Sequence, residues 1–104
     1  MIFIESPVFT QDVTSLLTDD RYAALQRYLA TYPFAGDLII GTGGLRKVRW
    51  ASGTKGKSGG VRVIYYYLAD DAQIRMILIY RKGIKDDLTP AEKKTLRRLN
   101  EDWQ

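Results

Sequence analysis

The spacing of hydrophobic residues divides the chain into a helical first part and a strand-rich second part. Apolar residues recur at helical intervals over 7–17, after Ser6 as the capping residue and Pro7 at the first helical position. The stretch 18–32 repeats leucine and tyrosine at the same interval and ends before Pro33. We therefore predict two amphipathic helices whose apolar faces lie in the core.

Beyond these helices, apolar residues alternate with a period of two. Residues 45–50, 61–68 and 74–80 are rich in valine, isoleucine and tyrosine, and 2–4 is a shorter run of the same kind. These patterns predict four strands. Asp70-Asp71 indicates a tight turn, which would join the last two strands as an antiparallel hairpin.

The end of the chain carries a complete helix start. Thr89 is placed as the N-cap, Pro90 occupies the first helical position, and Glu92 completes a capping box. The element order β-α-α-β-β-β-α over 1–104 predicts one α+β domain. We expect a mainly antiparallel sheet with the two N-terminal helices packed on one face, and a C-terminal helix.

Composition narrows the possible chemistry. The chain of 104 residues contains no cysteine and no histidine. Disulfides, cysteine-based metal sites and every histidine-dependent mechanism are therefore excluded. Catalysis would have to use lysine, arginine, tyrosine or carboxylate groups, and we expect neither a metal nor a cofactor.

The sequence also suggests where the protein acts. Residues 1–6 lack the basic region and long apolar run of a signal peptide, and no stretch approaches the roughly 18 apolar residues of a membrane span. We therefore expect a cytoplasmic protein with no membrane partner.

Charge is distributed unevenly along the chain, whose net charge is +4. Residues 1–43 hold two Lys/Arg and five Asp/Glu, whereas residues 44–104 hold fourteen and seven. A basic sheet region beside a mildly acidic helical region indicates a polyanionic partner. Scattered, solvated lysines are the alternative interpretation.

The predicted strands place several cations in an ordered way. Lys47 and Arg49 are two residues apart and therefore project from the same face of their strand. Arg62 alternates with valines on the next strand, and Arg81-Lys82 ends the last. If these strands are neighbours, the cations converge on the face opposite the helices. Such a cluster is costly to assemble unless an anion fills it, and RNA phosphate is the obvious candidate.

The stretch between the predicted strands 45–50 and 61–68 is expected to be a loop, and it contains one misleading motif. Residues 51–58 nearly match a nucleotide-binding P-loop, but Ala51 replaces the first glycine, and a strand follows where a P-loop requires a helix. A basic loop whose Lys55 and Lys57 touch RNA backbone is a better interpretation, and a plain solvated loop is equally possible. Tyr66 offers a ring for base stacking, although packing within the sheet is the simpler role for any single tyrosine.

Three stretches, 36–49, 60–66 and 80–89, resemble the RelE/HigB-like toxins of type II toxin–antitoxin systems, most specifically in the run Gly-Thr-Gly-Gly-Leu-Arg-Lys. The resemblance implies an endoribonuclease that cleaves translated mRNA in the A site of the 30S ribosomal subunit, in contact with rRNA. By resemblance, the catalytic residues are Lys47, Arg49, Arg62 and Lys82. Arg46, Lys55, Lys57, Tyr66 and Arg81 would contribute to RNA binding. The resemblance also implies a cognate helix-turn-helix antitoxin of HigA type.

The chemistry suits these residue types. A 2′-hydroxyl attacks the adjacent phosphorus, and fixed cations stabilise the charge that develops on the phosphoryl oxygens. Lys47 is a candidate base if its cationic neighbours favour its neutral form. The chain departs from some relatives by having Arg49 in place of a lysine, and by having no tyrosine in 86–89. These departures concern the residues that transfer protons, whereas the positions implied to bind phosphate keep lysine or arginine.

Two other functions fit parts of the pattern. ParE-like relatives inhibit DNA gyrase and cleave no RNA, but they usually lack a complete cationic site. A non-catalytic RNA-binding module would use the basic sheet for docking alone, and would bind RNA in a salt-dependent way without cleaving it.

Overall fold

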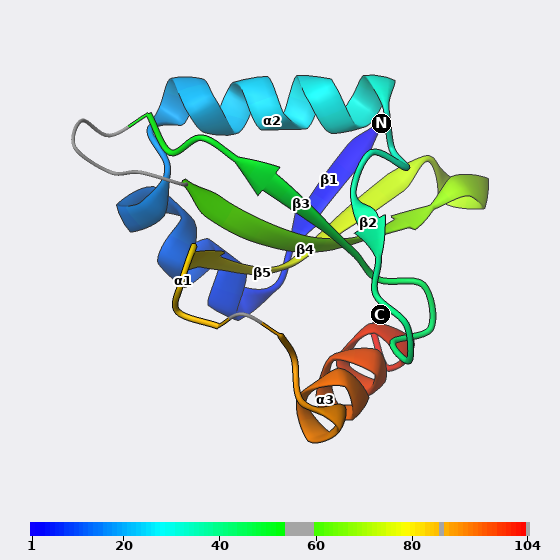
Figure 1. Cartoon of the computed structure of the whole chain (residues 1–104). Coiled ribbons are helices and arrows are strands. Elements are labelled where there is room, and N and C mark those ends of the chain that lie inside the picture. The colour runs from blue at the N-terminus through cyan, green and yellow to red at the C-terminus, as the bar shows by residue number, and fades with distance from the viewer. Residues whose placement is uncertain (54–59, 86, 104) are drawn as a thin grey trace.

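The computed structural model describes residues 1–53, 60–85 and 87–103. The elements run in the order β1 (Ile2–Glu5), α1 (Pro7–Leu16), α2 (Asp19–Thr31), β2 (Asp37–Leu38), β3 (Arg46–Trp50), β4 (Val61–Leu68), η1 (Ala69–Asp71, a 3₁₀ turn), β5 (Gln73–Arg81) and α3 (Pro90–Glu101). The five-stranded sheet has the order β1-β5-β4-β3-β2. Strand β1 is parallel to β5, and the other neighbours are antiparallel (Figure 1). This confirms the predicted α+β class.

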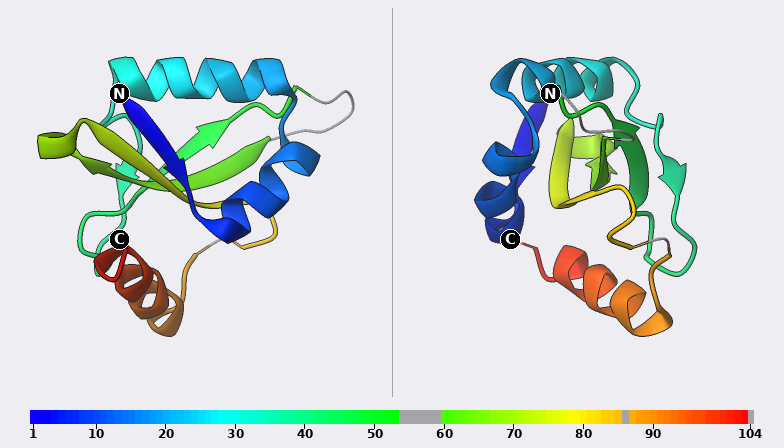
Figure 2. Two further views of the ribbon diagram at one scale, coloured as in Figure 1. Left: turned by 180° about the vertical axis from the view of Figure 1, so that it is seen from behind. Right: turned by 60° about the vertical axis from the view of Figure 1, so that its left-hand side comes forward.

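The sheet buries residues on both faces. The main core joins the apolar sides of α1 and α2 to one face, with Phe9, Leu25 and Tyr65 fully buried. A small core on the other face centres on Ile64 and Ile77, against which Leu96 of α3 packs together with Leu88 and Trp103, which lie just outside that helix. Figure 2 shows α1 and α2 on one side of the sheet and α3 at its lower end. None of the described helices combines the length and apolar character that a membrane span requires.

An irregularity in the β4–β5 pairing supplies residues to both cores. Ile64 pairs with Leu78 but Tyr65 pairs with Met76, so Ile77 is an extra residue in β5. Ile77 and Leu78 both join the small core, whereas Met76 lies in the main core. The Ser6 hydroxyl donates a hydrogen bond to the Ile77 carbonyl at 2.7 Å, which ties this bulge to the start of α1.

The three predicted helix starts are confirmed. Ser6, Thr18 and Thr89 each accept a hydrogen bond from the backbone N–H three residues further on, at 3.1, 3.2 and 3.1 Å. Each side chain thereby satisfies one backbone donor that has no partner inside the helix.

The antiparallel hairpin predicted around Asp70-Asp71 is confirmed, and its turn is the 3₁₀ turn η1, which ends at Ala72 with a left-handed φ of 47°. The two-residue strand β2 was not expected, because a strand this short has no detectable period. It pairs with β3, placing Asp37 opposite Lys47.

The segment before β2 is fixed by a buried tyrosine. The Tyr65 hydroxyl accepts a hydrogen bond from the Gly36 N–H at 2.9 Å and donates one to the Pro33 carbonyl at 2.8 Å. A Cβ atom on Gly36 would lie 2.9 Å from both the Lys47 carbonyl oxygen and the Tyr65 ring. The absence of a side chain at Gly36 therefore lets β2 approach β3 closely.

We expect Tyr65→Phe to destabilise the fold by about 1–3 kcal/mol, because it leaves the buried Gly36 N–H without its partner. Urea denaturation would measure the loss. Tyr32→Phe is the matched control, since Tyr32 is 60% exposed and should tolerate the change. Equal stability of the two variants would contradict this role of the Tyr65 hydroxyl.

Candidate phosphate-binding site

Cations from the strands β3 and β4 and from the segment after β5 meet in one pocket. It has a volume of about 250 Å³ and lies on the face of the sheet opposite α1 and α2. The lining residues are Asp37, Lys47, Arg49, Arg62, Lys82, Gly83 and Lys85. The structure thus brings together the four residues predicted to be catalytic, Lys47, Arg49, Arg62 and Lys82, although their catalytic role stays a prediction.

Two arginines face each other at the centre of this group. Arg49 on β3 and Arg62 on β4 are directly paired across the strands. Paired residues have Cβ atoms about 4.5–5.5 Å apart, and like charges at this spacing destabilise a sheet. The Arg62 guanidinium also donates to the Val61 carbonyl at 3.2 Å. A bound anion between the two guanidinium groups would relieve their repulsion.

The other two predicted cations are Lys47, on β3, and Lys82, in the segment after β5. Lys47 lies two residues before Arg49 and therefore on the same face. Lys82 follows β5, and its backbone N–H donates to the Gly60 carbonyl at 3.2 Å. Among described residues, Lys47, Arg49 and Lys82 have no acidic partner within ion-pair distance. The pocket therefore carries positive charge that a phosphate could neutralise.

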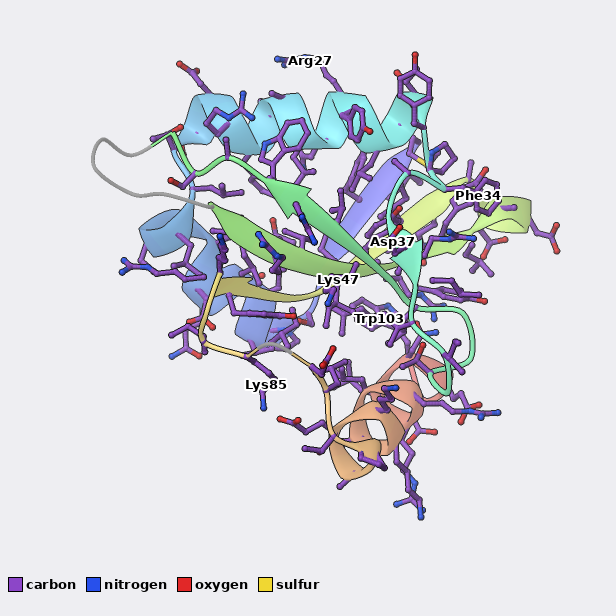
Figure 3. The ribbon with its side chains drawn as sticks, in the orientation of Figure 1. Arg27, Phe34, Asp37, Lys47, Lys85 and Trp103 are labelled. Carbon is purple, nitrogen blue, oxygen red and sulfur yellow. The ribbon has the colours of Figure 1, made fainter. Side chains whose placement is uncertain are left out.

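Sequence reasoning missed two lining residues with charged side chains, Asp37 and Lys85. Asp37 belongs to the unexpected strand β2, and Figure 3 shows it near Lys47. Lys85 follows a turn after β5, where the sequence has no strand period from which its direction could be inferred. In both cases the chain fold, and not a local pattern, brings the residue to the pocket.

Tyr80 lies beside Arg62 in the β4–β5 pairing and packs against the small core. Burial raises the pKa of its hydroxyl, and the charges of Arg62 and Lys85 oppose this shift. The phenol is therefore neutral and adds no negative charge near the arginines.

A second depression, of about 320 Å³, adjoins the first. Both are lined by Asp37 and Lys47. The second also includes Lys93 of α3 and the aliphatic residues Leu38 and Leu88. The cationic pocket therefore continues into a surface that could hold more of a polymer than one phosphate.

Of the predicted RNA-binding residues, those that the structure describes do not line this pocket. Arg46 contributes to the other side of β3, where its guanidinium donates to the Gly36 carbonyl at 2.8 Å and lies 4.9 Å from the centre of the Phe34 ring. Tyr66 packs against the small core, and the exposed Arg81 does not line the pocket. The binding roles of Arg46, Tyr66 and Arg81 stay predictions.

The basic loop between β3 and β4 is described only at its two ends. Lys55 and Lys57 lie outside the described residues, so their contacts with RNA stay predictions. The P-loop-like stretch 51–58 precedes strand β4 and no helix, as the sequence pattern predicted. The helix N-terminus that holds phosphate in a P-loop is therefore missing at this position.

Comparison with known proteins identifies the architecture. No protein-family model matches the sequence. A mutant of the E. coli toxin RelE in the free state is similar in structure, with a TM-score of 0.59 and 11% identity over 95% of each chain. A chain of the intact E. coli RelBE toxin–antitoxin complex matches with a TM-score of 0.58 and 12% identity, over 79% of this chain and 96% of that one. Together with the strand order and the placement of the helices, these similarities show that the chain has the fold of the toxin RelE.

Proposed function

We propose that this protein is a toxin that cleaves translated messenger RNA in the ribosomal A site. The observation that carries the proposal is the directly paired Arg49 and Arg62, at the centre of a pocket with five cationic side chains. The fold supports it, because the similar structures are those of a toxin and of its complex with an antitoxin.

In the proposed reaction, the 2′-hydroxyl of one nucleotide loses its proton and attacks the adjacent phosphorus to form a 2′,3′-cyclic phosphate. The bond to the 5′-oxygen of the next nucleotide breaks, and that oxygen takes up a proton from water. Negative charge grows on the phosphoryl oxygens as this happens. Arg49 and Arg62 would stabilise that charge with preorganised guanidinium groups. Lys82, at the edge of the pocket, would bind a phosphate oxygen.

The proton transfers require a different kind of group. An arginine stays protonated and is a poor base, so Arg49 and Arg62 are assigned to charge stabilisation. Lys47 is the lysine of the sheet face and the candidate base for the 2′-hydroxyl. It shares the pocket with the exposed Arg49 and the half-buried Arg62.

We further propose that the protein acts in the cytoplasm and that a partner protein controls its activity. The similarity to the toxin of a RelBE complex supports a cognate antitoxin for this chain. We propose a helix-turn-helix antitoxin of HigA type, which would cover the cationic face or keep the toxin from the ribosome.

Arg62→Ala should lower mRNA cleavage by about a hundredfold to a thousandfold, because it removes one fixed cation from the developing charge. Primer extension in a cell-free translation system would map the cuts. The control is Arg27→Ala, because the Arg27 side chain projects from α2, on the side of the sheet away from the pocket (Figure 3). Cuts are expected at A-site codons only when ribosomes are present. A folded wild-type protein that makes no cuts would overturn the proposal, and a supercoiling assay would then test the ParE-like alternative.

Lys47→Met should reduce the cleavage rate by about a hundredfold or more if Lys47 is the general base. Single-turnover rates on programmed ribosomes would measure the effect across a range of pH, with the exposed Lys94→Met as the control. A variant that retained the full rate would exclude Lys47 as the base.

An excess of the cognate antitoxin should abolish cleavage in the same translation system. Titration of the antitoxin against a fixed toxin concentration would give an endpoint set by the stoichiometry of the complex. Cleavage that continued undiminished in excess antitoxin would contradict the proposed partnership.

A further inference from the structure

Lys85 is a pocket residue with an unusual connection to the rest of the fold. It lines the cationic pocket together with Arg49 and Arg62, and its side chain is 36% exposed. Its ammonium forms an ion pair with Glu92, in the first turn of α3. Glu92 itself does not line the pocket. The pair therefore links the phosphate pocket to a helix that lies beside it.

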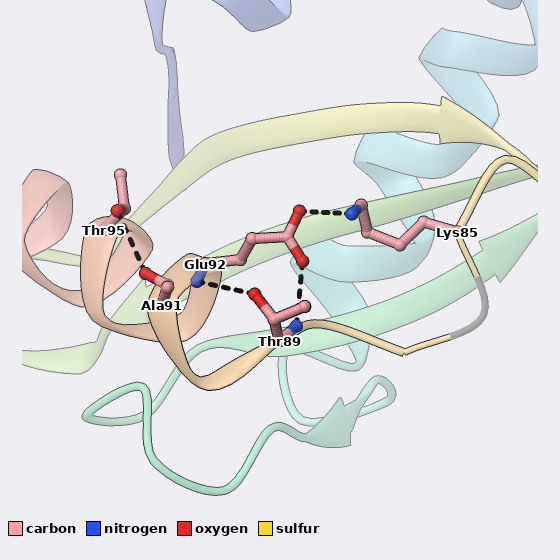
Figure 4. Close-up of polar contacts among 5 residues, drawn as sticks. All are labelled: Lys85, Thr89, Ala91, Glu92 and Thr95. Atoms are coloured by element: carbon pink, nitrogen blue, oxygen red, sulfur yellow. Dashed lines mark hydrogen bonds and ion pairs between the residues drawn. The ribbon is translucent and has the colours of Figure 1, made fainter.

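The carboxylate that holds Lys85 is fixed by the helix cap. One oxygen of Glu92 accepts a hydrogen bond from the Thr89 N–H at 2.8 Å, and the other pairs with Lys85 (Figure 4). The Glu92 N–H in turn donates to the Thr89 hydroxyl at 3.1 Å. Glu92 thus has a defined position before Lys85 binds to it, which lowers the entropy cost of the pair.

The electrostatics are consistent with a persistent contact. The hydrogen bond from Lys85, followed by that from the Thr89 backbone, lowers the pKa of Glu92 to about 2. Glu92 is therefore ionised at every pH at which RNA cleavage would be measured. Because both side chains are partly exposed, the pair is expected to add little to stability. The main effect of the pair is to fix the position of the Lys85 ammonium.

A lysine ammonium has three N–H donors, and Glu92 needs only one of them. Among the residues that the structure describes, no other carboxylate pairs with this ammonium, which leaves two donors for the oxygens of a phosphate in the pocket. Without Glu92, the long lysine stem would be free to adopt many rotamers in solvent, and ordering it on substrate binding would cost conformational entropy.

We propose that Lys85 is a further phosphate-binding residue of this pocket, and that Glu92 positions it from the capping box of α3. The inference rests on the proposed function in that both assign an RNA phosphate to the pocket. It goes further because it assigns roles to Lys85 and Glu92, which do not lie on a strand and could not be found from the alternation of strand residues.

The test is a double-mutant cycle of Lys85→Met, Glu92→Gln and the two combined. Glutamine keeps the capping box, because its side-chain oxygen still accepts from the Thr89 N–H, but it removes the charge that pairs with Lys85. The matched control is Glu101→Gln, which breaks the Arg97–Glu101 ion pair on the same helix, away from the pocket. Thermal unfolding of each variant checks that α3 stays folded.

Two readouts separate this inference from the endonuclease proposal. The first is the dissociation constant for a 2′-O-methyl oligoribonucleotide at low salt, since this probe binds as RNA but cannot be cleaved. The second is the rate of mRNA cleavage on ribosomes. If the wild type binds the probe but cleaves no mRNA, the endonuclease proposal fails, while the cycle measured on the probe still tests Lys85 and Glu92.

We expect Lys85→Met to weaken probe binding and slow cleavage about tenfold, and Glu92→Gln to do so roughly threefold. The combined variant should be no weaker than Lys85→Met, because Glu92 acts through Lys85. The Glu101→Gln control should match the wild type. Tighter binding by Glu92→Gln would show that Glu92 competes with phosphate, which overturns the positioning role. An unchanged Lys85→Met, or a Glu92→Gln loss that persists without Lys85, would also overturn the proposal.

Discussion

The structure depends on burial of both faces of the central strands. Along β4, Val63 and Tyr65 lie in the main core against α1 and α2, whereas Ile64 lies in the small core near α3. The helix α3 covers only part of the second face, and the uncovered remainder of that face contains Arg62. The same strand therefore contributes to both hydrophobic cores and presents a charged residue to the pocket.

This arrangement is what allows the cations to stay close together. The direct pairing of Arg49 with Arg62 is unfavourable in the absence of an anion. The apolar contacts of residues that alternate with them, such as Val48 and Val63, fix the register of the strands. A shift by one residue would move these valines out of the main core, so the hydrophobic free energy holds the arginines in place despite their repulsion.

Hydrogen bonds at the periphery determine which further residues reach the pocket. The Tyr65 hydroxyl and the Arg46 guanidinium both bind Gly36, and this contact places β2, with Asp37, beside Lys47. At the other edge, the capping box of α3 fixes Glu92, which pairs with Lys85. The pocket thus has a sheet-based centre and edges that depend on separate local anchors.

The sequence by itself determined the three helices, the four longer strands and the faces of those strands. The caps at Ser6 and Thr89 and the periods of the long segments involve residues a few positions apart, so local chemistry is sufficient to predict them. The same alternation placed Lys47 and Arg49 on one face. Only the tertiary structure decided that Arg46 is bound to Gly36, that Asp37 forms an edge strand, and that Lys85 joins the pocket. Those outcomes depend on contacts between residues distant in sequence, whose free energy exists only once the sheet has formed and its two cores are filled.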